Sequence, residues 1–182
     1  PFYSMDGKTD ECHYFGHEAW LQEHLRVPPG SVCADIGAHI GLWTMFWAKE
    51  GASRVYACEP ADAAMRCICA TAWARRYENV KPIWAALSDK AGYASLSDER
   101  GGSHISGNTG ELVPVCTFDE LFGGLNRLDI VKIDTEGCEA RILRGGRKTI
   151  RRLKPKIVLE VHQFAAGRFD PPLLQRLVGL AY

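Results

Sequence analysis

Short apolar segments alternate with longer helical patterns along most of the chain. The apolar segments are residues 32–36, 54–58, 80–84, 128–133 and 156–161. Apolar residues recur at helical spacing in three stretches between them, residues 41–49, 61–77 and 138–153, the last interrupted by two glycines. Strands that alternate with helices are typical of a mainly parallel sheet with helices on both faces. The alternation therefore predicts an α/β fold.

Four further segments complete the prediction. Residues 91–116 combine short alternating pieces with a Gly- and Ser-rich stretch, which predicts a hairpin or loop excursion from the main fold. Thr117 with Glu120 three residues later is a capping box, so a short helix is expected to follow and to reach Phe122. Further helices are expected near residues 17–25 and 170–177.

Length and composition limit the class of protein. The chain has 182 residues, which suits one domain with a full hydrophobic core. It carries 22 Lys and Arg against 22 Asp and Glu, so a chain-wide basic field for nucleic acid is excluded and nucleic acid is not an expected partner. No apolar run reaches the roughly 18 residues of a membrane span. Seven cysteines without a C-x-x-C pair favour a reducing, cytoplasmic location.

The basic residues are unevenly distributed. Residues 1–120 carry an excess of six acidic groups and residues 121–182 an excess of six basic ones. Most of the basic excess lies between Arg141 and Lys156, where several basic residues recur at helical spacing. A solvated helix face is the simpler interpretation of this pattern, and a docking surface for an anionic substrate is the alternative.

The loop after the first strand carries the strongest functional signal. It reads D-x-G-x-x-x-G from Asp35 to Gly41, between a buried strand and a buried helix. Glycines in such a loop permit a tight turn and the close approach of a ligand at the carboxyl end of the strand. The spacing differs from the G-x-G-x-x-G of a dinucleotide site, and a carboxylate before the first glycine suits a cationic group better than a pyrophosphate.

A second acidic residue ends the next strand. Glu59 follows Gly37 by 22 residues, a position from which a carboxylate can accept both hydroxyls of an adenosine ribose. The two acidic positions together favour S-adenosylmethionine over a nicotinamide cofactor as the ligand. The alternative is that Asp35 caps the turn and that the glycines serve only helix–strand packing.

These segments resemble the FkbM-type S-adenosylmethionine-dependent methyltransferases. Residues 34–41, 55–60 and 86–89 look like three blocks of that family in order. The most distinctive block is D-I-V-K-I-D-T-E-G-C-E at residues 129–139, followed by L-R-G-G at 143–146 and P-K-I-V-L-E at 155–160. The resemblance implies a Rossmann-like class I methyltransferase fold and, usually, methylation of a hydroxyl oxygen on a sugar or natural-product-like small molecule.

The resemblance also implies roles for individual residues. The methionine part of the cofactor would be held by the first loop, namely Asp35, Gly37, Ala38, His39 and Gly41. The ribose would be held by Glu59 with its neighbour Pro60, and the adenine would lie near Ala86 and Leu87. Asp134 would lie near the sulfonium.

The chain departs from the family pattern in two places. His39 stands where the family usually has Asn. The last two strands of the family fold have no counterpart before Tyr182, so we expect these C-terminal strands to be missing. Otherwise we expect a single methyltransferase domain over residues 1–182. Its parts would be a lead-in (1–30), a cofactor-binding half (31–89), the loop or hairpin excursion (90–116) and a substrate and catalytic half (117–182).

Candidate catalytic residues lie after the last two predicted strands. His162 is the best general base, because an imidazole titrates near neutral pH, and Asp134 and Glu136 are the other candidates. A divalent metal held by Asp134, Glu160 and His162 is possible but not favoured. We therefore expect an S-adenosylmethionine-dependent O-methyltransferase. An NAD(P)-dependent oxidoreductase and a non-catalytic module of the same fold are the alternatives.

Overall fold

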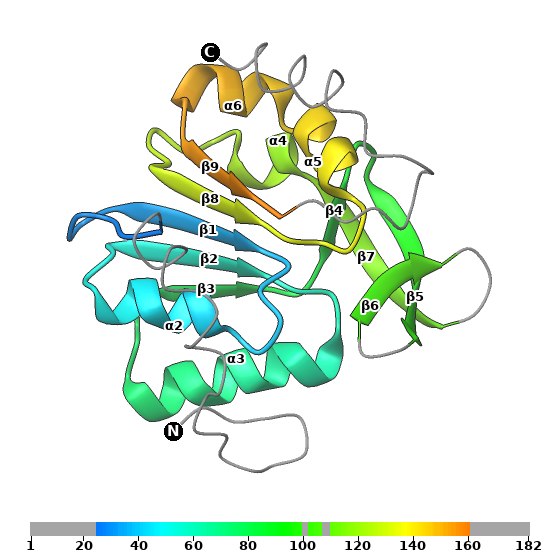
Figure 1. Ribbon diagram of the computed structural model, residues 1–182, viewed down its shortest axis with the longest axis horizontal. Helices are drawn as coiled ribbons and strands as arrows, with labels where there is room; N and C mark the ends of the chain where they lie inside the picture. The colour runs from blue at the N-terminus through cyan, green and yellow to red at the C-terminus, as the bar shows by residue number, and fades with distance from the viewer. Residues whose placement is uncertain (1–24, 100–101, 107–109, 161–182) are drawn as a thin grey trace.

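The computed structural model describes residues 25–99, 102–106 and 110–160, and both outer predicted helices lie beyond this part of the chain. Its centre is a parallel sheet in the order β3-β2-β1-β8-β9 (Figure 1). The strands are β1 (Val32–Ile36), β2 (Arg54–Cys58), β3 (Val80–Ile83), β8 (Ile130–Ile133) and β9 (Lys156–Leu159). All five predicted strands are present, and the predicted α/β class is confirmed.

Helices cover both faces of this sheet because alternate strand residues point to opposite sides. Cys33 and Val55 pack in one cluster with residues of α2 (Leu42–Lys49) and α3 (Asp62–Arg75). Ile36 and Ile133 pack in a second cluster with residues of α4 (Phe118–Phe122), α5 (Glu139–Gly145) and α6 (Arg147–Leu153). Figure 1 shows α2 and α3 gathered near β2 and β3, with α4, α5 and α6 near β8 and β9. Within the described residues, no helix is long and apolar enough to cross a membrane.

The apolar stripe of α3 differs from the sequence pattern. Met65, Ile68 and Ala72 are buried, as the spacing of the stripe predicts. Cys69 and Trp73, which recur at the same helical spacing within residues 61–77, are exposed, and Trp73 retains 84% of its accessible surface. The buried face of the helix is turned around its axis relative to this spacing, because Ala64, Cys67 and Thr71 are buried whereas Cys69 and Trp73 are not.

The break predicted at the two glycines between residues 138 and 153 is present. Gly146 separates α5 from α6. It is buried, and a Cβ at this position would lie 2.8 Å from the ring of Phe118. The basic residues therefore belong to two short helices rather than one continuous face. Arg144 pairs with Asp89, and Arg152 donates hydrogen bonds to backbone carbonyls of the 123–125 turn, so part of the basic cluster stabilises the fold.

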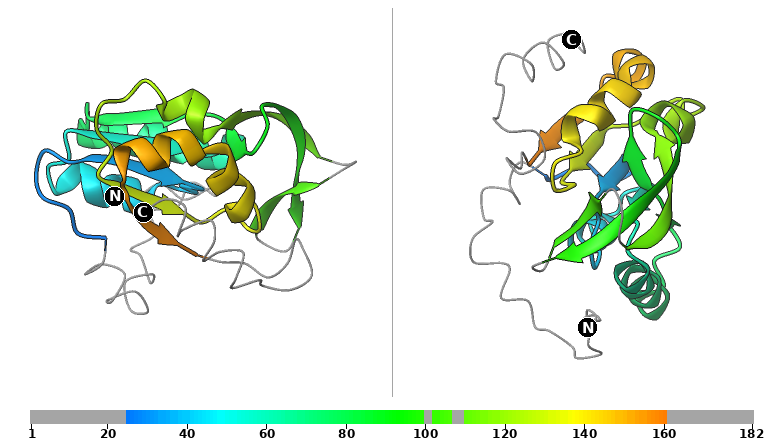
Figure 2. Two further views of the ribbon diagram at one scale, coloured as in Figure 1. Left: turned by 90° about the horizontal axis from the view of Figure 1, so that it is seen from above. Right: turned by 90° about the vertical axis from the view of Figure 1, so that its right-hand side faces the viewer.

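The predicted excursion after residue 90 is larger than a hairpin. It forms a second sheet in the order β4-β7-β5-β6, made of β4 (Ala86–Ser88), β5 (Gly92–Glu99), β6 (Gly102–Ser106) and β7 (Glu111–Thr117). β5 pairs with β6 and β7 in antiparallel orientation, and β4 pairs with β7 in parallel. Figures 1 and 2 place this sheet beyond the carboxyl ends of the parallel strands. The strand β4 was not predicted, because three residues are too few for a visible pattern.

Candidate functional site

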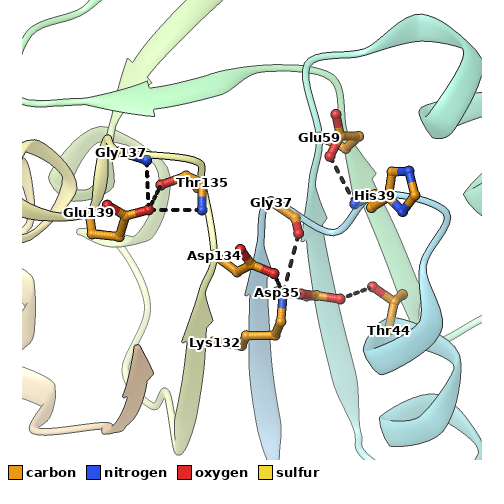
Figure 3. Close-up of polar contacts among 10 residues, drawn as sticks. All are labelled: Asp35, Gly37, His39, Thr44, Glu59, Lys132, Asp134, Thr135, Gly137 and Glu139. Carbon is orange, nitrogen blue, oxygen red and sulfur yellow. Dashed lines mark hydrogen bonds and ion pairs between the residues drawn. The ribbon is translucent and has the colours of Figure 1, made fainter. Parts of the chain in front are cut away.

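The loops after β1 and β8 meet at the centre of the parallel sheet. β1 pairs with β2 on one side and with β8 on the other. The strands that follow β1 directly, β2 and β3, extend the sheet in one direction, and β8 and β9 extend it in the opposite direction. In open α/β sheets, ligands bind at the carboxyl ends of the strands beside such a switch point. The predicted residues Asp35, Gly37, Glu59 and Asp134 all lie at this edge (Figure 3).

The two glycines of the first loop are explained by packing within the protein. A Cβ on Gly37 would lie 1.7 Å from the carbonyl oxygen of Asp134, and one on Gly41 would lie 2.9 Å from Cγ1 of Ile68. Both glycines also have positive φ angles, +74° and +89°. Only glycine fits these positions. The packing alternative raised by the sequence thus accounts for both residues, and contact with a ligand stays a prediction.

Glu59 holds the first loop from the end of β2. One carboxylate oxygen accepts a hydrogen bond from the backbone N–H of His39 at 2.8 Å, and the other accepts one from Ala61 at 2.9 Å. Burial raises the pKa of Glu59, and these two hydrogen bonds oppose that rise. A carboxylate has about four acceptor positions, so Glu59 can still accept hydroxyl groups of a ligand.

Asp35 belongs to a buried charge network (Figure 3). It has no solvent-accessible surface, and its Oδ2 accepts a hydrogen bond from Thr44 at 2.7 Å. Its Oδ1 lies 3.6 Å from the Nζ of Lys132 on the neighbouring strand, and within the described residues it accepts no hydrogen bond. Burial raises the pKa of Asp35, and the Lys132 ammonium and the Thr44 hydroxyl oppose that rise. Contact between Asp35 and a ligand stays a prediction.

Lys132 is a site residue that the sequence reasoning missed. Its Nζ lies 3.1 Å from Oδ2 of Asp134 and 3.4 Å from the carbonyl oxygen of Gly37. Burial opposes the charged form, but the carboxylates of Asp35 and Asp134 outweigh burial, so the pKa of Lys132 is raised. Lys132 therefore keeps its proton at neutral pH and cannot act as a general base. The available signal was a lysine inside a buried strand, where an unpaired charge is costly.

The loop after β8 is organised by Glu139. One oxygen of this buried carboxylate accepts hydrogen bonds from the N–H groups of Thr135 and Gly137 and from the hydroxyl of Thr135. Glu136 and Gly137 both have positive φ angles, 51° and 106°, which turn the chain from β8 into α5. Asp134 is placed at the strand end with 28% of its side chain exposed. Glu136 lies in the turn, partly exposed.

Three predicted cofactor residues, Pro60, Ala86 and Leu87, belong to neither the loop after β1 nor the loop after β8. Ala86 and Leu87 are buried in β4, in two different apolar clusters. The carbonyl oxygen of Pro60 accepts a hydrogen bond from the indole N–H of Trp84 at 2.7 Å, which sets a half-exposed Trp beside the end of β2. Trp84 was not singled out from the sequence, although an aromatic residue directly after a strand end is a visible signal.

Of the two histidines predicted in the site, the structure describes only His39. His39 is exposed and has a positive φ of 50° in the first loop. Partial desolvation and the nearby Lys132 ammonium lower its pKa, so the imidazole is neutral at neutral pH. His162, the predicted base, lies outside the described residues. Among residues 25–99, 102–106 and 110–160, no three potential ligand side chains gather to hold a metal ion.

The parallel order of the sheet, the glycine turn after β1 and the acidic residue ending β2 define a Rossmann-like class I methyltransferase fold. A family model described as the methyltransferase FkbM domain matches residues 35–178. The chain therefore belongs to the FkbM methyltransferase family.

Solved structures share this fold. A methyltransferase FkbM from Methylobacillus flagellatus superposes with a TM-score of 0.65 at 18% identity, over 92% of this chain and 40% of that one. A precorrin-6y C5,15-methyltransferase from Geobacter metallireducens gives 0.55 at 17% identity, over 99% and 77% of the two chains. A putative rRNA methylase from Clostridium thermocellum gives 0.56 at 11% identity, over 94% and 82%.

A curated relative is much longer than this chain. The chain is 27% identical over 205 residues to the AMB antimetabolite synthetase AmbE of Pseudomonas aeruginosa. The match covers 86% of this chain and 10% of AmbE, so the chain spans about a tenth of that protein's length.

Proposed function

We propose that this chain is a methyltransferase domain that uses S-adenosylmethionine and methylates a hydroxyl oxygen of a small or carbohydrate-like molecule. The observation that carries the proposal is the Glu59 carboxylate, which lies at the end of β2 directly beside the glycine turn of β1. Its two oxygens are oriented by backbone N–H groups and retain acceptor positions for two vicinal hydroxyls. This is the chemistry that an adenosine ribose requires.

The other predicted residues fit the cofactor in different ways. Asp134 is partly exposed and forms an ion pair with Lys132, and a carboxylate at this position suits the cationic end of S-adenosylmethionine. Ala38, His39 and the two glycines of the first loop shape the backbone next to Glu59. Asp35 is buried beneath the loop, where it pairs with Lys132 and accepts a hydrogen bond from Thr44. We propose that Ala86 and Leu87 form an apolar floor near the adenine.

Methyl transfer requires an acceptor oxygen in line with the sulfonium and the loss of the hydroxyl proton. S-adenosylmethionine supplies the methyl group and the leaving group, so the protein orients the reactants and removes the proton. Asp134 is held in an ion pair, which favours orientation of the acceptor hydroxyl over proton removal. We propose His162 as the base, with Glu136 as the second candidate.

The ribose role of Glu59 is tested by isothermal calorimetry with S-adenosylhomocysteine. Glu59→Gln removes the charge and one acceptor oxygen while it keeps the size of the side chain. We expect a loss of about 2 kcal/mol, or roughly thirtyfold in Kd, because a ribose hydroxyl loses its acceptor. Glu78→Gln makes the same change at an exposed position and should bind like the wild type. Equal affinity of Glu59→Gln and wild type would remove the ribose assignment.

The base role of His162 is tested by its own substitution. His162→Ala should lower methyl transfer by about 10²-fold or more, the usual contribution of a general base, and leave cofactor affinity unchanged. Methyl transfer is measured with radiolabelled donor against a panel of sugars and hydroxylated small molecules. If His162→Ala retains full turnover, the base is elsewhere, and Glu136→Gln becomes the next variant.

A further inference from the structure

Lys132 connects the two loops of the site. Its side chain extends from β8, where it pairs in register with Asp35 of β1, and 11% of it is exposed. The Nζ reaches three groups: the Asp134 carboxylate at 3.1 Å, the Gly37 carbonyl at 3.4 Å and the Asp35 carboxylate at 3.6 Å. Figure 3 shows the ammonium in the middle of these oxygens, with Glu59 on the far side of the first loop.

Lys132 faces several carboxylates. Asp35 and Asp134 are its ion-pair partners, and the carboxylate of Glu160 also favours its charged form. The two carboxylates differ in exposure, since Asp35 is completely buried whereas 28% of the Asp134 side chain is exposed. Asp134 is also the closer of the two to Nζ. The ammonium therefore offsets mainly the carboxylate that a ligand can approach.

This arrangement bears on the one difference between the methyl donor and its product. S-adenosylmethionine carries a positive sulfonium, whereas S-adenosylhomocysteine has a neutral thioether at the same atom, and the rest of the molecule is shared. We propose that Lys132 is a positioning residue that sets the preference of the site for the charged donor over the neutral product, by offsetting the charge of Asp134. This proposal rests on the proposed function, because it places the sulfonium near Asp134.

The ratio of two dissociation constants tests the proposal. Lys132→Met keeps an unbranched chain of similar length and removes the charge. Asp134 then faces the ligand without its counter-charge, so the ratio of Kd for S-adenosylhomocysteine to Kd for S-adenosylmethionine should rise by about fivefold. A purely structural role for Lys132 would weaken both ligands equally and leave the ratio unchanged. Lys148→Met, on the exposed surface of α6, is the matched control and should leave the ratio as in the wild type.

A second variant should move the ratio in the opposite direction. Asp134→Asn removes the partly exposed carboxylate from the site, while Lys132 keeps its ion pair with Asp35, so the ratio should fall by about fivefold. If Lys132→Met does not fold, as circular dichroism would show, Lys132→Gln removes the same charge with a polar side chain and takes its place. An unchanged ratio in every folded Lys132 variant overturns the role of Lys132 and leaves the proposed function intact. A wild-type chain that binds neither ligand overturns the proposed function, and the Lys132 proposal with it.

Discussion

Gly37 sets how closely the two loops of the site approach each other. The position of its absent Cβ is occupied by the backbone carbonyl of Asp134, and its φ angle is +74°. The N–H groups of Gly37 and Ala38 both donate to the carbonyl oxygen of Cys58, which ties the same turn to β2. One glycine thus holds together the ends of three strands.

Gly37→Ala should be strongly destabilising. We expect a loss of about 3 kcal/mol or more in the free energy of unfolding, because the new methyl group meets backbone atoms that cannot move aside. Gly30→Ala is the matched control: its φ is +83°, but no atom lies within 4 Å of the added Cβ, so only the backbone strain of about 1 kcal/mol is expected. Chemical denaturation measures both. Similar losses in the two variants would show that the close contact with Asp134 is relieved by movement of the loop.

The turn between β8 and α5 depends on a side chain from the helix that follows it. Glu139, in the first turn of α5, accepts hydrogen bonds from two N–H groups of the turn with a single oxygen. The turn also contains two successive residues with positive φ angles. Glu139 therefore compensates a costly backbone conformation directly next to Asp134.

Glu139→Ala should lower the free energy of unfolding by about 2 kcal/mol, because two turn N–H groups lose a buried acceptor. Glu139→Gln keeps one oxygen of the same shape and should lose less than half of that amount. Urea denaturation of the two variants provides the comparison. A Gln variant as unstable as the Ala variant would show that the negative charge, rather than the hydrogen bonds, stabilises the turn.

Elements with a strong local pattern were predictable from the sequence, and contacts between distant elements were not. The capping box at Thr117 has the predicted reciprocal hydrogen bonds with Glu120, because both partners lie within one helical turn. The second sheet was anticipated only as an excursion, since β4 has three residues and its partner β7 begins 23 residues after it ends. Lys132 was missed for the same reason: nothing local shows that its strand pairs with β1.

At the scale of the whole molecule, the candidate site draws on both halves of the chain. β1 and β2 supply Asp35 and Glu59 from the acidic first part, and β8 supplies Lys132 and Asp134 from the basic second part. A ligand held between these strands would bind only when the sheet is complete. Cofactor binding should therefore stabilise the entire fold rather than one loop.

Thermal unfolding should report this coupling. S-adenosylhomocysteine at 100 times its Kd adds about 2.7 kcal/mol to the stability of the folded state. For a chain of 182 residues this corresponds to a rise of about 5–10 °C in Tm. NAD at the same concentration should leave the Tm unchanged, and differential scanning fluorimetry measures both. A rise with NAD alone would favour the oxidoreductase alternative.

The pairing of β1 with β8, two strands far apart in the sequence, also determines when the site can form during synthesis. The hydrogen bond from Lys132 to the carbonyl of Gly37 joins residues 95 positions apart, whereas His39 and Glu59 are separated by only 20. During synthesis, Glu59 therefore emerges from the ribosome long before Lys132 and Asp134. Until β8 emerges, the buried Asp35 lacks its counter-charge and the centre of the sheet lacks a neighbouring strand. A nascent chain that ends before β8 consequently contains the glycine turn but no complete binding edge.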